Sequence, residues 1–127
     1  MFQPLSLLAI AAGAVLGAWS RWWLALWLNT HASGWPWGTV AANLVGGYLI
    51  GLLLGLVSLH PEWPAWVRLA TVTGFLGALT TFSTFSAETV AMLETGAYAR
   101  ATGYVALSLA GSVALTALGL ATARAAS

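Results

Sequence analysis

Long apolar stretches separated by short polar or proline-containing linkers dominate the chain. Four such stretches stand out, at about residues 5–28, 39–59, 66–93 and 98–123. Each reaches the length of about 20 residues that a helix needs to cross a bilayer. None shows the alternation of apolar and polar residues that spanning strands require. The pattern predicts an all-α membrane protein in which residues 1–127 form a single domain of four transmembrane helices.

The composition narrows the class of protein further. Hydrophobic residues make up 60% of the 127 residues and charged residues only 6%, with a mean hydropathy of +0.87. Soluble domains carry about 25% charged residues, and four scattered arginines form no basic surface for nucleic acid. We therefore expect the lipid bilayer, and no nucleic acid, as a partner. We expect no enzymatic activity either, because paired carboxylates and Ser–His arrangements are missing and His31 and His60 are isolated.

The arginines give no preferred orientation in the membrane. With four spans, Arg68 and Arg124 fall on one side, whereas Arg21 and Arg100 lie nearest to the other. Orientation follows the excess of Lys and Arg in short loops. Because the count is balanced, we expect the chain to insert in both orientations.

A stripe of polar and small residues follows the second stretch at four-residue spacing. It consists of Thr39, Asn43, Gly47, Gly51 and Gly55. Glycines at this spacing allow another helix to approach closely. Asn43 places an amide about one turn inside the membrane, where it either bonds a neighbouring helix or faces a polar pathway.

The third stretch contains a segment that is poorly suited to a continuous helix. Between residues 74 and 86, two glycines precede five hydroxyl side chains. Glycine weakens helices and hydroxyls compete for backbone hydrogen bonds. We predict a break near Gly77–Thr80, where freed carbonyl groups could hold a cation. The alternative is a continuous helix whose hydroxyls bond back to their own carbonyls.

Two further sets of side chains lie where the membrane tolerates polarity poorly. Phe82 and Phe85 share one helix face, and their positive ring edges could meet a small anion, although on composition alone packing is by far the commoner role of such rings. Four hydroxyls recur every four residues along the last stretch, at Tyr104, Ser108, Ser112 and Thr116. They could donate to an anion or serve as interhelical hydrogen bonds. Glu88 and Arg21 are the charged candidates nearest these features.

Three segments of the chain resemble the bacterial fluoride channel family (Fluc). They are residues 13–21, residues 38–46 and the run Gly-Phe-Leu-Gly-Ala-Leu-Thr-Thr-Phe-Ser-Thr-Phe at 74–85. The resemblance implies a fluoride-selective channel that exports fluoride passively across the bacterial cell (inner) membrane. It also implies an antiparallel, dual-topology homodimer with two pores and a structural sodium ion at the dimer interface.

The resemblance further implies roles for individual residues. Asn43 matches an amide that donates to fluoride, and Phe82 and Phe85 match a pair whose ring edges face the anion. The backbone carbonyls of Gly77 and Thr80 match the sodium ligands. A polar track corresponds to Tyr104, Ser108, Ser112 and Thr116, and further matching pore positions are Thr39, Ser83, Glu88 and Arg21. Ala78 departs mildly from the family, because many members have glycine there.

Other classes of membrane protein remain as alternatives from the residues alone. A small dual-topology proton-coupled drug or cation antiporter would also have four short helices, but it needs an intramembrane carboxylate in its first helix, which is absent here. A structural subunit or lysis protein would explain the glycine stripes. It would not explain Asn43 together with the hydroxyl stripe.

Overall fold

The computed structural model describes residues 3–29 and 34–127, and it consists of helices joined by short connections. The first two are α1 (Pro4–Leu28) and α2 (Trp37–Leu59). The third apolar stretch is divided into α3 (Ala65–Arg68), the π-helix η1 (Leu69–Leu76), α4 (Gly77–Leu79) and α5 (Phe82–Glu94). The last helix is α6 (Tyr98–Ala125). Four helical segments in this part of the chain are long and apolar enough to cross a membrane.

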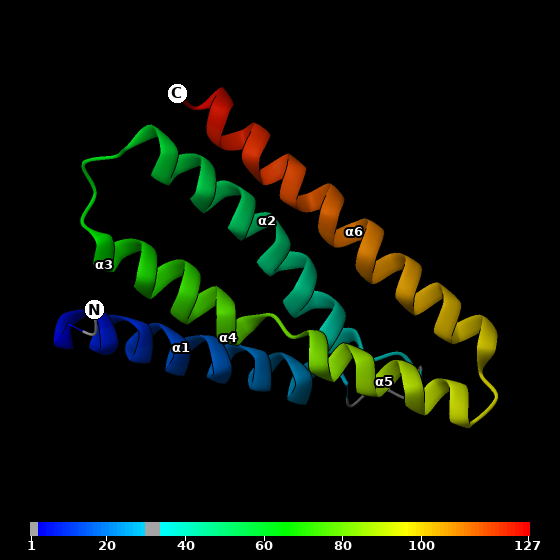
Figure 1. Ribbon diagram of the computed structural model, residues 1–127. Coiled ribbons are helices and arrows are strands. Elements are labelled where there is room, and N and C mark those ends of the chain that lie inside the picture. Colours follow the sequence, from blue (N-terminus) through cyan, green and yellow to red (C-terminus); the bar gives the residue numbers. More distant parts are fainter. Residues whose placement is uncertain (1–2, 30–33) are drawn as a thin grey trace.

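The helices pack as two pairs that converge near α5. Figure 1 shows α2 beside α6 and α1 beside the α3–η1–α4 segment, with α5 continuing past the interruption. Glycine allows the close contact in each pair. A Cβ atom at Gly13 or Gly17 would collide with backbone carbonyl oxygens of η1, and one at Gly51 or Gly119 would collide with backbone of the facing helix. Such contacts suit a membrane, where helix association depends on close packing.

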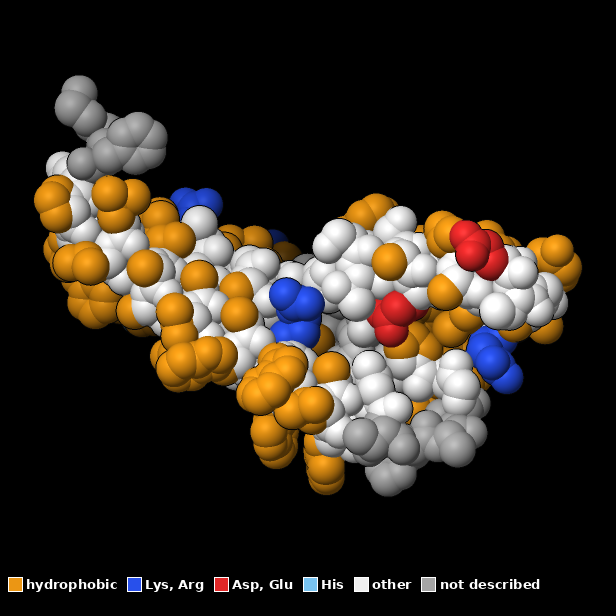
Figure 2. Space-filling view, turned by 90° about the horizontal axis from the view of Figure 1, so that it is seen from below, with side chains coloured by type: hydrophobic (Ala, Val, Ile, Leu, Met, Phe, Trp, Pro, Cys, Tyr) orange, Lys and Arg blue, Asp and Glu red, His pale blue; other side chains and the backbone are white. Residues whose placement is uncertain are grey.

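Much of the apolar surface stays exposed. Side chains such as Leu8, Trp19, Trp22 and Val113 are all more than 60% exposed. Figure 2 shows hydrophobic side chains gathered over one half of the visible face, with few charged groups among them. In water, an exposed apolar surface of this size would cause aggregation. In a bilayer, the same side chains lie against the hydrocarbon chains of the lipids.

The third span is interrupted at two residues. Thr80 and Thr81 have extended backbones, with ψ angles of 152° and 119°. The interruption thus lies at the end of the predicted Gly77–Thr80 interval and extends one residue beyond it. Thr81 caps α5, because its side chain accepts a hydrogen bond from the Thr84 amide at 3.1 Å. The continuous helix considered as an alternative is not formed.

Candidate functional site

A groove of about 440 Å³ opens beside the interruption. Its walls come from α2, η1, α4, α5 and α6, so it joins segments that are far apart in the sequence. The residues predicted from the sequence that line it are Asn43, Gly77, Thr80, Phe82, Phe85, Ser108 and Ser112. The groove therefore gathers most of the candidate positions onto one surface.

The Asn43 amide is bonded to the interrupted backbone. Its Oδ1 accepts from the Thr81 amide at 2.8 Å, and its Nδ2 donates to the Thr81 carbonyl oxygen at 3.1 Å. In a regular helix the Thr81 amide would bond to the carbonyl of Gly77. Asn43 therefore replaces a helical hydrogen bond and keeps one Nδ2 proton for another acceptor. No clear signal in the sequence points to Thr81, apart from its place before a new helical turn.

The carbonyl oxygen of Gly77 loses its helical donor in consequence. Thr80 N–H bonds to Leu76 O at 3.0 Å, and Thr81 N–H is taken by Asn43. Arg21 Nε donates to the neighbouring carbonyl of Ala78 at 3.0 Å, which places the guanidinium at the same helix end. Oxygen ligands of this kind suit hard cations such as sodium.

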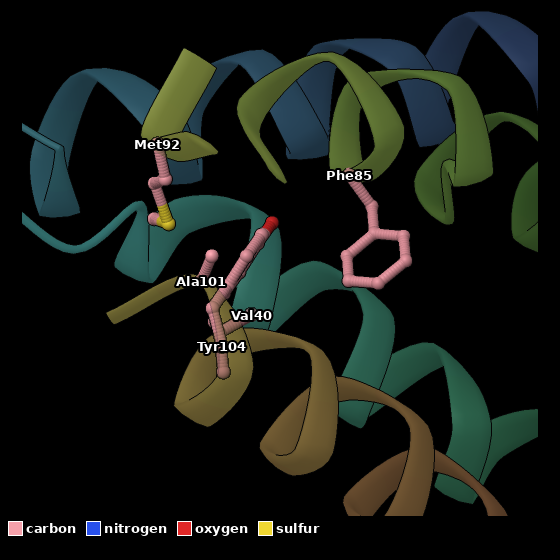
Figure 3. Packing of buried hydrophobic residues seen from close by; sticks show 5 residues of the cluster. All are labelled: Val40, Phe85, Met92, Ala101 and Tyr104. Carbon is pink, nitrogen blue, oxygen red and sulfur yellow. The ribbon is translucent and has the colours of Figure 1, made fainter. Parts of the chain in front are cut away.

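The two phenyl rings differ strongly in exposure. Phe85 is only 8% exposed, and it packs against Tyr104 with ring centroids 5.2 Å apart. Phe82 is 74% exposed, although its ring lies 5.6 Å from that of Phe85 at 58°. Figure 3 shows Phe85 and Tyr104 within one packed cluster that also holds Val40, Met92 and Ala101. Packing within the chain therefore accounts in part for Phe85, whereas the described residues leave most of the Phe82 ring uncovered.

The four hydroxyls of α6 have different surroundings. Tyr104 is fully buried and donates to Glu88 Oε1 at 3.3 Å, and Thr39 donates to the same oxygen at 2.7 Å. Thr116 Oγ1 lies 2.9 Å from the carbonyl oxygens of both Gly47 and Ser112, so its proton is shared between an interhelical bond and a bond within α6. Ser108 is only 5% exposed, and its hydroxyl has no hydrogen-bond partner in the described part of the chain.

Several candidate positions lie outside the groove. Thr39, Glu88 and Tyr104 form their own cluster behind Phe85, whereas Ser83 is exposed on α5 with its hydroxyl 3.3 Å from that of Thr81. Among residues 3–29 and 34–127, no three His, Cys, Asp or Glu side chains gather into a metal site. His31 lies outside these residues.

Comparison with known proteins identifies the family of the chain. A model of the family described as CrcB-like protein, Camphor Resistance (CrcB), matches residues 8–120. The chain belongs to this family. It is 70% identical to the fluoride-specific ion channel FluC of Bordetella petrii, over 96% of this chain and 94% of that protein. It is 68% identical to FluC of Bordetella bronchiseptica, over 97% and 94%.

More distant members extend along the whole chain as well. The FluC protein of Cupriavidus taiwanensis is 51% identical over 95% of this chain and 96% of its own length. The match therefore includes the interruption, the groove and both flanking helix pairs. The family resemblance read from the sequence is confirmed.

Proposed function

We propose that the chain is a fluoride-selective channel that carries fluoride passively across the bacterial inner membrane. The observation that carries this proposal is near full-length similarity to proteins named as fluoride-specific ion channels. That similarity does not support the proton-coupled antiporter. The groove adds a physical reason, because it offers neutral donors and ring edges within a span.

Fluoride loses its water shell on entering such a groove, and side chains must replace the lost hydrogen bonds. The free proton of Asn43 Nδ2 and the unpartnered Ser108 hydroxyl are donors of this kind. The edges of Phe82 and Phe85 carry partial positive charge. None of these groups has a full charge, so the ion is held weakly enough to leave again. Ser112 extends the donor line along α6.

A second, antiparallel copy completes the pathway in this proposal. One wall of the groove consists of exposed Phe82 and exposed Gly77, which the chain itself leaves uncovered. A homodimer would cover both and would form two equivalent pores. The balanced arginine count allows the two copies to insert in opposite directions.

A sodium ion at the interface fits the backbone at the interruption. The carbonyl oxygens of Gly77 and Thr80 would hold it, because the helical donor to Gly77 is diverted to Asn43. The ion would supply positive charge between two apolar copies. Arg21, Thr39, Ser83, Glu88, Tyr104 and Thr116 remain predicted pore or vestibule positions.

Flux from liposomes tests the proposed function. Purified protein is reconstituted in vesicles loaded with fluoride or chloride, and efflux is followed with ion-selective electrodes. We expect fluoride efflux with little chloride efflux, and Phe82→Ile should slow fluoride by about tenfold or more, which corresponds to about 1.4 kcal/mol. Tyr98→Ile removes another exposed aromatic ring outside the groove and should leave the rate unchanged. Equal chloride efflux, or cation–proton exchange without fluoride flux, would contradict the proposal.

A further inference from the structure

A second groove, of about 540 Å³, lies at the opposite end of α2 from Asn43. It runs between the end of α2 and the beginning of the third span. Its walls are formed by Val57, Trp63, Pro64, Ala65, Arg68, Leu69 and Thr73. In Figure 1 the end of α2 is separated from α3 by the loop that joins them, so the two helices diverge there. None of these residues takes part in the fluoride groove.

Arg68 supplies the positive charge at the mouth of this groove. It is exposed, and no carboxylate in the described part of the chain pairs with its guanidinium. The nearest acidic residue in the sequence, Glu62, is held by His60 Nδ1 at 3.1 Å. The same contact and a backbone hydrogen bond keep the pKa of Glu62 below its usual value, the backbone bond contributing most. Glu62 therefore stays ionised, and its carboxylate is bonded to His60 rather than to Arg68.

The position of the groove along the span matches the level of the lipid headgroups. Trp63 lines the groove and Trp66 follows three residues later in the chain, and indole rings favour the level of the lipid headgroups. Trp63 is held in place by stacking on His60, with ring centroids 4.9 Å apart. From Ala65 to Thr73 the groove extends about 12 Å inward along the helix axis. Val57 and Leu69 give it aliphatic walls, and Thr73 lies at its inner end.

A cationic side chain at the level of the lipid headgroups, next to a groove with aliphatic walls, has the chemistry of a phospholipid site. We infer that this groove binds one anionic phospholipid, with its phosphate on Arg68 and one acyl chain between Val57 and Leu69. Basic pockets between spanning helices bind anionic headgroups in this way. A zwitterionic lipid gains less, because its ammonium group offsets the attraction of the phosphate to the guanidinium.

Lipid retention by the full-length protein tests this inference. Detergent-solubilised protein is titrated with phosphatidylglycerol or phosphatidylcholine, and bound lipid is counted by native mass spectrometry. We expect a preference for phosphatidylglycerol, and Arg68→Gln should weaken its binding about fivefold, the effect of one basic residue near a lipid surface. Arg124→Gln is the matched control, because Arg124 lies on the same predicted side but outside the groove. It should change binding less than twofold.

A second variant tests the aliphatic part of the site. Val57→Phe fills the channel and leaves Arg68 intact, so it should also weaken phosphatidylglycerol binding while fluoride efflux continues. Excess inorganic phosphate should not displace the lipid if the acyl chain contributes. Equal retention of both lipids, equal effects of Arg68→Gln and Arg124→Gln, or full displacement by inorganic phosphate would overturn the inference.

Discussion

The pair formed by α2 and α6 behaves differently at its two ends. At one end Gly51 lies against the backbone of Thr116 and Gly119 against that of Tyr48, so that no side chain separates the helices. At the other end Asn43 and Ser108 line an open groove. The same four-residue stripe therefore packs two helices together in one half and leaves polar groups available in the other.

The contrast between the two ends shows that a hydroxyl in a membrane helix can either bond a neighbouring helix or remain unpartnered beside a groove. Thr116 is bonded to Gly47 across the close contact, which is the interhelical role weighed from the sequence. Ser108, two turns away on the same helix, has no partner within the described residues and faces the groove. Spacing makes these two residues equivalent, and only their surroundings distinguish them.

Widening the close contact should have the largest effect. Gly51→Ala places a methyl group against the Thr116 carbonyl, which is backbone and cannot rotate away. Overpacking of this kind costs about 1–3 kcal/mol and sometimes more. We expect a lower thermal midpoint and poor recovery in size-exclusion chromatography.

Gly111→Ala is the control for this substitution. It lies on the same helix pair, but its added methyl group would meet a terminal methyl of Leu44 at 2.7 Å, which can move. It should therefore fold nearly as well as the original chain. Equal losses in both variants would mean that the backbone contact at Gly51 is not what holds this end together.

Removing the amide at the groove should have the next largest effect. Asn43→Ala deletes both bonds to Thr81, and a buried backbone group without a partner costs about 1–3 kcal/mol. We expect lower stability together with a loss of at least about tenfold in fluoride efflux.

Asn43→Asp separates these two effects. Its carboxylate still accepts from the Thr81 amide but donates nothing and repels an anion. It should keep more of the stability than Asn43→Ala and conduct no better. Fluoride efflux at the original rate in the Asp variant would contradict a donor role for Asn43.

A paired substitution on α6 tests the comparison directly. Ser108→Ala removes a buried hydroxyl that has no partner within the described residues, so stability should stay the same or rise while fluoride efflux falls by about tenfold. Thr116→Val removes an interhelical bond and should lower stability by about 1 kcal/mol, with a smaller loss of fluoride efflux per folded protein than in Ser108→Ala. Denaturation midpoints and liposome efflux measure the two properties separately. The reverse pattern would mean that Ser108 serves packing and Thr116 serves the ion.

The sequence predicted the spans well because each is an apolar run bounded by proline or glycine. It also located the interruption, because glycines and hydroxyls cluster there. It could not show that Asn43 bonds to Thr81, since that contact joins residues 38 positions apart. Nor could it anticipate the π-helical turns of η1, which lie against the glycines of α1, or which hydroxyls remain unpartnered. These features depend on how two helix pairs meet, and no local pattern encodes that.

The smallest effect on the chain itself is expected at Gly77. An added methyl group there would meet only the Val72 carbonyl oxygen, at 3.7 Å, so Gly77→Ala fits within one copy and favours the helix. If a second copy crosses at this exposed position, the same methyl group overpacks the interface and should weaken dimerisation about tenfold or more. Dissociation measured by single-molecule photobleaching in liposomes checks this, with Gly111→Ala as a control outside the interruption. If dimerisation is unchanged, two copies do not cross at Gly77, because the added methyl group then meets no atom of a second copy.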